Sequence, residues 1–242
     1  MPFPRDFHKS YLEFQEISRE QVMTLTNLLS RIVKRINRYI KPDALDLRGD
    51  RDIEWAFIAG HIPESPGIAL DFGCGETPAG LAAALKGYKV IALDLNQVHW
   101  SFMHPSMEFI KEDINTYETG LTFDLIINCS TIEHIGISGR YGGFDETNGD
   151  LTSMQRLRFM LKPGGIHLMT IPVGKDKVCP PFHRIYGNIR LPQLLEGYQK
   201  IHEEYWIKRS GKNLWIPATK NEALEIEGGS SFYGLGLFIL RN

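Results

Sequence analysis

The stretch that most constrains the fold is residues 67–80, where an apolar run breaks into a glycine turn and then into a helical pattern. Residues 68–72 predict a short buried strand. Gly73 and Gly75 then permit a tight turn and let a ligand approach the backbone closely. A helix is expected over residues 79–86. This order places free backbone N–H groups at the carboxyl end of a parallel strand, which is where open α/β sheets bind ligands.

The glycine turn admits three interpretations. A dinucleotide-binding fingerprint has the pattern G-x-G-x-x-G, and its third glycine is replaced here by Pro78. Asp71 instead completes the pattern Asp-x-Gly-x-Gly with the two glycines. A plain turn without a ligand is the third interpretation. Thr77 offers an N-cap hydroxyl to the helix, and Pro78 suits its first position.

Two later apolar strands each carry a carboxylate near their end. Residues 88–94 end in Asp94, which lies 21 positions after Gly73, close to the spacing of about 20 at which an acid meets a ribose diol. A carboxylate that accepts two hydroxyl hydrogen bonds is charge-assisted and selective in geometry. Residues 107–114 are a third expected strand and contain Asp113.

Two further motifs complete a recognisable order. Residues 123–130 predict a fourth strand that leads into Glu133 and His134, and the turn at 161–165 precedes a fifth strand over 166–171. Together the motifs resemble the class I S-adenosylmethionine-dependent methyltransferases over residues 66–172. The resemblance implies an α/β fold with a Rossmann-like, seven-stranded, mostly parallel sheet, an antiparallel last strand and helices on both faces. It also implies S-adenosylmethionine as cofactor and S-adenosylhomocysteine as product.

The same resemblance assigns cofactor contacts. In these enzymes the acid that corresponds to Asp113 meets the adenine amino group, and Leu95 and Ile114 would flank the ring, while Asp94 would hold the ribose. The expected cofactor-binding residues are Asp71, Phe72, Gly73, Cys74, Gly75, Thr77, Asp94, Leu95, Asp113, Ile114, Asn128 and Cys129.

Later segments fit the end of such a sheet. Residues 198–208 and 231–240 match the sixth and the antiparallel seventh strands, and residues 209–230 between them are rich in turn residues. Asp50 and Asp150 are suited to cap two earlier helices.

A narrower resemblance covers residues 120–200. The strings around His134, Tyr141, Asp150 and His183 look like a family catalogued as a domain of unknown function, whose members often occur with sugar and surface-glycan biosynthesis enzymes. This resemblance implies a link to glycan chemistry and no particular substrate.

The acceptor side has candidate residues in two loops. An O-methyl acceptor needs a base to take its proton, and His134 and His183 are the candidates, with Glu133 third. Each histidine has a structural role as its alternative. Candidate substrate-binding residues are Arg140, Tyr141, Arg184 and Tyr186. Glu133, His134 and His183 have no fixed metal-ligand spacing, so no metal is expected.

The sequence therefore predicts an enzyme, a methyltransferase acting on a small polar acceptor by O- or N-methylation, with a sugar or glycan precursor leading. The alternatives are a nucleic-acid or protein methyltransferase and a non-catalytic module that binds S-adenosylmethionine. A net charge of −2 gives no overall reason to expect nucleic acid. The sequence does not set the oligomeric state.

Composition also bears on the compartment. The cysteines, Cys74, Cys129 and Cys179, are odd in number and widely spaced, which favours reduced thiols and a cytoplasmic setting. No apolar run reaches the length of a transmembrane helix, and residues 1–6 do not have the pattern of a signal peptide.

The organisation along the chain is a helical extension, residues 1–49, before a methyltransferase domain, residues 50–242. Residues 19–41 predict an amphipathic helix with a basic second half. Such a helix most often packs on a core. Contact with anionic lipid, or with a phosphorylated substrate, is the alternative.

Overall fold

The computed structural model describes residues 49–242 apart from residues 66, 103, 140 and 209–213. The helix expected over residues 19–41, and with it any membrane contact, lies outside the described residues, as does Arg140.

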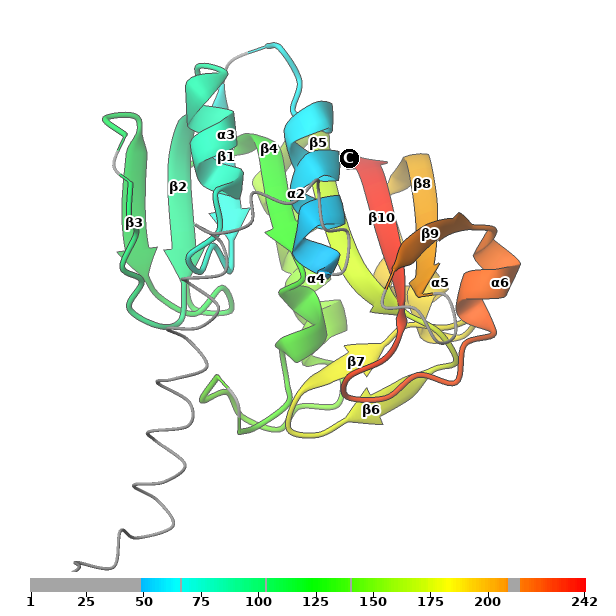
Figure 1. Ribbon diagram of the computed structural model, residues 1–242. Helices are drawn as coiled ribbons and strands as arrows, with labels where there is room; N and C mark the ends of the chain where they lie inside the picture. The colour runs from blue at the N-terminus through cyan, green and yellow to red at the C-terminus, as the bar shows by residue number, and fades with distance from the viewer. Residues whose placement is uncertain (1–48, 66, 103, 140, 209–213) are drawn as a thin grey trace, which may run out of the picture. The chain divides into compact units, whose positions relative to one another are not determined.

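An eight-stranded sheet forms the centre of the fold, in the order β3-β2-β1-β4-β5-β10-β8-β9 (Figure 1). The five strands from β3 to β5 are parallel, whereas β10 is antiparallel to both β5 and β8. The chain passes from β1 outward to β2 and β3 and then returns to β4. The reversal between β1 and β4 is the position at which open α/β sheets bind ligands. The strands are β1 Ile68–Phe72, β2 Lys89–Asp94, β3 Met107–Lys111, β4 Phe123–Cys129, β5 Leu161–Val173, β8 Gln199–Lys208, β9 Trp215–Ala218 and β10 Gly234–Arg241.

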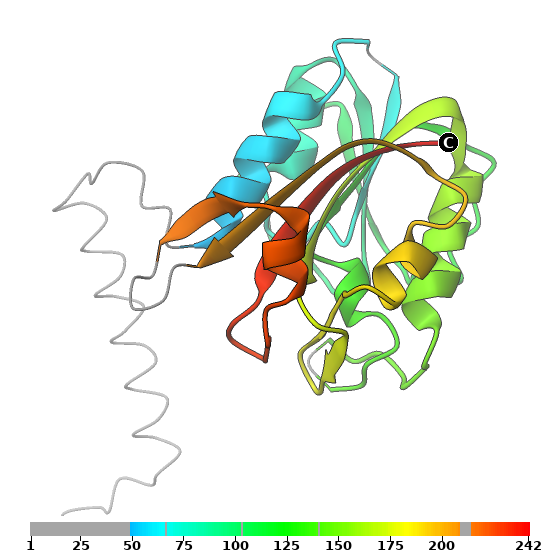
Figure 2. The same ribbon diagram turned by 90° about the vertical axis from the view of Figure 1, so that its right-hand side faces the viewer.

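Helices cover both faces of the sheet. Figure 2 shows α2 and α3 on one face and α4 and α5 on the other. Successive strand residues point to opposite faces, so Leu125 packs into the core under α2 and α3 while Ile126 packs into the core under α4 and α5. The helices are α2 Asp50–His61, α3 Ala79–Leu85, α4 Gly149–Met160, α5 Arg190–Leu194 and α6 Lys220–Leu224. Among these described helices, none combines the length and apolar character that a membrane crossing requires.

Two smaller elements lie beyond the carboxyl ends of the central strands. A 3-10 helix, η1 (Ile132–His134), follows β4, and β6 (Lys177–Cys179) pairs with β7 (His183–Ile185) in a separate two-stranded sheet. Tyr186 joins this small sheet to the end of β5 through a bridge to Val173. The loop after β4 and the loop after β5 therefore meet at the same edge.

The predicted sheet is confirmed, and the structure adds an eighth strand. The additional strand, β9, and the helix α6 both lie within the segment expected to consist of turns. A capping box starts α6: Thr219 N donates to Glu222 Oε2 at 2.7 Å, and Glu222 N donates to Thr219 Oγ1 at 3.3 Å. The Thr-x-x-Glu signature of this box is visible in the sequence.

The predicted N-cap residues are wrong at three helices. Gly49, Pro78 and Asn148 hold the N-cap positions of α2, α3 and α4, and none of the three helices has a side-chain cap. The carboxylates of Asp50 and Asp150 accept hydrogen bonds from other elements instead. The helix stop predicted at residues 161–165 is confirmed, because α4 ends at Met160. Strand β5 begins earlier than predicted, at Leu161, and its pairing with β4 is irregular between Leu161 and Ile166.

Candidate functional site

The glycine turn after β1 is fixed against β2 and against the loop after β4. Gly73 N donates to the Leu93 carbonyl at 2.8 Å, and Cys74 N donates to the same oxygen at 3.2 Å. Gly73 has a φ of +62°, and a Cβ on it would lie 2.0 Å from Thr131 Cγ2. Only glycine combines this backbone conformation with such close packing. Thr131 Oγ1 in turn donates to the Gly73 carbonyl at 3.2 Å.

Asp94 at the end of β2 holds the turn in place. Its Oδ2 accepts from Gly75 N at 3.0 Å, and its Oδ1 accepts from Asn96 N at 2.9 Å. A carboxylate oxygen has two lone pairs, so both oxygens can accept a further hydrogen bond. Gly75 has a φ of +46°, and a Cβ on it would meet no atom of the described residues within 4 Å. The backbone at Gly75 therefore borders open space beside the Asp94 carboxylate.

The other predicted residues of the turn face inward. The side chains of Asp71, Phe72 and Cys74 are buried. The Asp71 carboxylate lies under α3, where a Cβ on Gly80 would be 2.7 Å from its Oδ2, and burial raises its pKa to about 7. Burial likewise raises the pKa of the Cys74 thiol. Thr77 is partly buried, and its N–H donates to the Cys74 carbonyl at 3.2 Å.

Asp113 and its neighbours lie at the end of the adjacent strand β3. The carboxylate of Asp113 accepts from Asn115 N at 2.8 Å and so shapes the turn after β3. The link to β2 is direct, because Glu112 N donates to the Asp94 carbonyl at 2.9 Å. Ile114 is buried, whereas Leu95 is 39% exposed. The structure therefore brings the turn after β1, Asp94 and Asp113 together at one edge of the sheet.

Strand β4 ends in a backbone conformation that is rare outside glycine. Ser130 has a φ of +50°, and its N–H donates to the Thr170 carbonyl at 3.0 Å. Asn128, also predicted as a cofactor contact, is fully buried, and its Oδ1 accepts from Ile132 N at 3.3 Å. The bend at Ser130 carries the chain into η1, whose last residue is His134.

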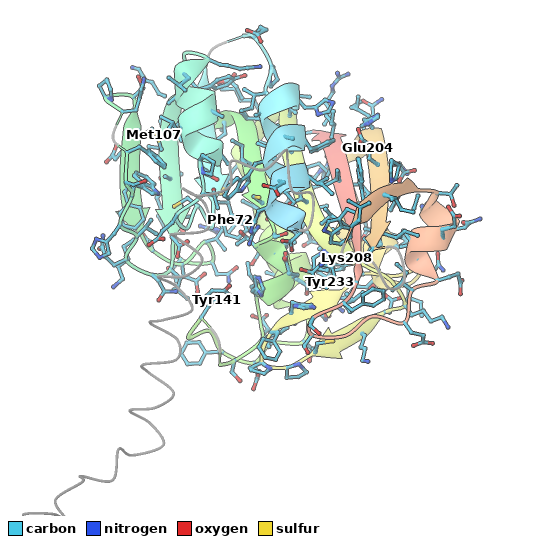
Figure 3. All side chains as sticks on the ribbon, viewed as in Figure 1. Phe72, Met107, Tyr141, Glu204, Lys208 and Tyr233 are labelled. Carbon is cyan, nitrogen blue, oxygen red and sulfur yellow. The ribbon has the colours of Figure 1, made fainter. Side chains whose placement is uncertain are left out.

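Two histidines from different loops come together beyond this bend. The ring centroids of His134 and His183 are 6.4 Å apart. Tyr141 packs edge-on against His134 at 4.7 Å, and Tyr233 packs edge-on against His183 at 5.1 Å. Figure 3 shows Tyr141 and Tyr233 coming from different loops. His183 is buried, whereas the His134 side chain is 16% exposed.

The hydrogen bonds of His134 set its tautomer. Its Nδ1 lies 2.5 Å from the Phe182 carbonyl oxygen. A carbonyl only accepts, so Nδ1 carries the proton of the neutral ring and Nε2 keeps its lone pair. Glu133 Oε1 lies 3.7 Å from that Nε2. Burial, followed by the nearby negative charge of Glu54, raises the pKa of Glu133 to about 8, so this carboxyl is protonated at neutral pH.

A cluster at the start of α2 completes this region, and sequence reasoning missed it. Ser130 Oγ donates to Glu54, Thr170 Oγ1 donates to Glu54 Oε1 at 2.7 Å, and Arg51 Nη1 donates to Glu54 Oε2 at 3.0 Å. Burial raises the pKa of Glu54 even though Arg51 opposes the shift. The sequence does contain one signal of this cluster: Glu54 lies three and four positions before Phe57 and Ile58, which puts its carboxylate on the apolar face of α2.

The same cluster reaches Cys129 and Tyr233. Cys129 is buried, and its Sγ lies 3.7 Å from Arg51 Nη1. Tyr233 Oη donates to Asp50 Oδ2 at 2.7 Å. The first turn of α2 therefore borders the histidine pair.

Arg184 and Tyr186, predicted as substrate contacts, are buried and hold the loops in place. Arg184 donates to the carbonyls of Ile135, Gly136 and Glu146. Tyr186 Oη donates to Asp150 Oδ2 at 3.1 Å, and Arg190 Nε donates to the same oxygen at 2.9 Å. Of the predicted substrate residues that the structure describes, Tyr141 is the exposed one, at 41%.

The sequence model of one family, described as "Caenorhabditis protein of unknown function, DUF268", matches residues 90–223, which is more than half of the chain. The chain belongs to this family. The match includes residues 120–200, whose sequence strings resemble a family of unknown function. No curated protein matches the chain.

Solved structures with the same fold are methyltransferases. One is a 1,6-didemethyltoxoflavin-N1-methyltransferase of Burkholderia thailandensis with bound S-adenosylhomocysteine. It is 13% identical to this chain, the alignment covers 92% of this chain and 89% of that one, and the TM-score is 0.52. Another is the N-methyltransferase NodS of Bradyrhizobium japonicum. It is 14% identical, the alignment covers 80% of this chain and 87% of NodS, and the TM-score is 0.50. A third is a putative S-adenosylmethionine-dependent methyltransferase of Listeria monocytogenes. It is 14% identical, the alignment covers 78% of this chain and 97% of that one, and the TM-score is 0.51. The chain therefore has the fold of the class I S-adenosylmethionine-dependent methyltransferases.

Proposed function

We propose that the chain is an enzyme that transfers a methyl group from S-adenosylmethionine to a small polar acceptor. The observation that carries this proposal is a contact between two loops: Thr131 Oγ1 donates to the Gly73 carbonyl at 3.2 Å. Through this contact the turn expected to hold the cofactor adjoins the loop that carries His134. The solved structures of the same fold that have S-adenosylhomocysteine bound support the choice of cofactor.

The residues present suit this cofactor. Asp94 has acceptor capacity left for the ribose hydroxyls, and the open space at Gly75 leaves room beside the backbone. Asp113 would accept from the adenine amino group, with Leu95 and Ile114 at the ring. The buried side chains of Asp71, Phe72, Cys74, Asn128 and Cys129, and the partly buried Thr77, would support the site from beneath, so that the backbone would make the direct contacts there.

When bound, S-adenosylmethionine supplies an electrophilic methyl group, and the protein has to position a nucleophile in line with it. His134 is the first candidate base, because the bond between its Nδ1 and the Phe182 carbonyl orients the ring and its side chain is more exposed than that of His183; its Nε2 would take the proton of the acceptor. His183, buried against Tyr233, is the second candidate. Glu133 is buried and lies beside His134 Nε2, so it would position that ring and tune its basicity.

The described residues around the histidine pair favour a neutral acceptor over an anionic one. The Arg51 guanidinium already donates to Glu54 Oε2, and Asp50, whose Oδ1 accepts from Arg51 N, adds a carboxylate in the same turn of α2. Arg184, which could have bound a phosphate, is buried against carbonyl groups and Asp150. A hydroxyl or amino group on a sugar or glycan precursor is the leading acceptor, and the family resemblance is the ground for that class.

We also propose a domain organisation and a cellular location for the chain. Leu47–Asn242 form one compact unit, in agreement with a methyltransferase domain over residues 50–242 that follows an extension over residues 1–49. Cys74, Cys129 and Cys179 are all free thiols, as is usual in a reducing compartment, and we propose a cytoplasmic location.

The test is methyl transfer from labelled S-adenosylmethionine to pooled nucleotide sugars, to nucleic acid and to lysate protein, with S-adenosylhomocysteine formation as the readout. The proposal expects product with the sugar pool and loss of that product in His134→Ala. Product only with nucleic acid or protein would favour a nucleic-acid or protein methyltransferase. Cofactor binding without turnover in any pool would favour a binding module.

A further inference from the structure

We propose that His61, His202 and Glu204 form a binding site for a divalent transition-metal ion, with zinc the leading ion. Each residue offers one ligand atom, and these atoms all lie within 4.8 Å of one another. His61 comes from the last turn of α2, and the other two come from β8. This proposal is independent of the proposed methyltransferase function.

His61 is already oriented as a ligand. Its Nδ1 lies 2.8 Å from the Phe57 carbonyl oxygen one turn earlier in α2. Because the carbonyl only accepts, Nδ1 carries the proton and Nε2 keeps its lone pair. Histidines that bind metals generally donate their other ring N–H in this way, which fixes the tautomer and the ring orientation. The Phe57 ring, with its centroid 4.4 Å away, holds the imidazole from the side.

A β-bulge places the two β8 residues on the face that α2 covers. In the pairing with β10, His202 lies opposite Ile239 and Lys200 lies opposite Leu240, so Ile201 is an extra residue. A bulge of this kind changes the face to which the following side chains point. His202 and Glu204 then share the face that carries Ile239, whereas the Lys200 ammonium lies 2.8 Å from Glu203 Oε1. A cation that would compete for Glu204 is thereby bound elsewhere.

The donor atoms suit zinc. His202 Nε2 lies 2.9 Å from Glu204 Oε1, and the His61 and His202 rings stack with their centroids 5.8 Å apart. Two imidazoles and one carboxylate, with water as a fourth ligand, form a common zinc coordination set. Ligand atoms around tetrahedral zinc lie about 3.3 Å apart, so the three donor atoms, now within 4.8 Å of one another, would move closer together on binding the ion. Trp206 Nε1, 3.4 Å from Glu204 Oε2, would keep the carboxylate oriented.

The site lies away from the histidine pair at the carboxyl edge. Figure 3 shows Glu204 beside the C-terminal half of α2, while Lys208 and Tyr233 lie toward the start of that helix. None of the three proposed ligands is buried, so an ion can enter from solvent. A bound ion would link α2 to β8, two elements far apart in sequence.

The test is a zinc titration of the full chain without an affinity tag, after treatment with a chelator, by calorimetry and by thermal unfolding. We expect one ion per chain with a dissociation constant in the micromolar range or below. A hundredfold excess of zinc over that constant should raise Tm by roughly 5 °C. Cobalt substitution should give the visible absorption of a tetrahedral site.

Four variants make the test specific. His202→Ala and Glu204→Gln should each weaken zinc binding at least tenfold, with Tm in chelator unchanged within a few degrees. His99→Ala, which removes an exposed histidine elsewhere, should bind as the parent does, and so should the double variant His134→Ala, His183→Ala. Absence of binding, equal binding in all variants, or a loss confined to the double variant would overturn the proposal.

Discussion

The imidazole rings of His134 and His183 lie 6.4 Å apart at an interplanar angle of 76°. One ring comes from η1 after β4 and the other from β7 after β5, so the pair exists only because both loops follow neighbouring parallel strands. Tyr141 packs edge-on against His134, and Tyr233 packs edge-on against His183. His134 differs from His183 in its contacts and in its greater exposure.

The first prediction concerns these two rings. His134→Ala should lower methyl transfer about 10²–10⁴-fold, the usual cost of losing a general base, and should leave the cofactor affinity within about twofold. For a hydroxyl acceptor the loss should shrink as pH rises, because the acceptor then ionises without help. His183→Ala should mainly raise KM. The exposed His99 provides the matched control, and full activity in both histidine variants would assign the rings a structural role.

The second prediction concerns Asp94. Asp94→Ala should weaken binding of S-adenosylhomocysteine at least tenfold, because charge-assisted hydrogen bonds worth about 1.5–3 kcal/mol disappear and each 1.4 kcal/mol is about one decade. Tm should also fall by a few degrees, since Gly75 N and Asn96 N lose their acceptor. Asp94→Asn keeps one acceptor oxygen, so its affinity for S-adenosylhomocysteine should lie between those of the parent and of Asp94→Ala. Unchanged affinity in the alanine variant would remove Asp94 from the cofactor site.

The third prediction compares the two glycines of the turn. Gly73→Ala should cost about 2–4 kcal/mol of unfolding free energy, because it combines positive-φ strain with a Cβ 2.0 Å from Thr131 Cγ2. Gly75→Ala should cost about 1 kcal/mol, because its Cβ would enter open space. The Gly75 variant should instead lose cofactor affinity. Chemical denaturation and calorimetry separate the two effects, and equal stability of both variants would contradict the turn geometry.

The fourth prediction follows from the pKa of Glu133. The native carboxyl keeps its proton up to about pH 8, whereas the unfolded chain releases it near the ordinary glutamate pKa of 4.5. The native state binds more protons between these values, so stability falls as pH rises through that window and levels off above it. Asp71, with its pKa raised to about 7, acts in the same direction.

Glu133→Gln removes the contribution of Glu133 to that slope. Relative to the parent, the variant should gain stability steadily between pH 5 and pH 8 and reach about 2–4 kcal/mol at the upper end. Urea unfolding at four pH values measures this difference. Parallel pH profiles for the two proteins would mean that Glu133 is ionised in the native state.

The strand ends could be predicted from the sequence because the signal there is local. Apolar runs followed by glycine or a carboxylate indicate where parallel strands stop, and Gly73, Asp94 and Asp113 accordingly share one edge. Local spacing also placed His134 and His183 in loops that the sheet topology then brought together.

The remaining residues depend on contacts between distant segments. Arg184 and Tyr186 look like pocket residues in the sequence, yet they converge on Asp150 and on loop carbonyls. The cluster around Glu54 forms because α2 packs over the ends of β4 and β5, where Ser130 and Thr170 supply its hydrogen bonds. A helical pattern alone does not specify which strands a helix covers.

Calorimetric titration of the chain with S-adenosylhomocysteine tests the central claim most directly. The account predicts one site per chain with a dissociation constant in the micromolar range, and no heat from nicotinamide or flavin cofactors. Tight binding of NAD without any response to S-adenosylhomocysteine would contradict it.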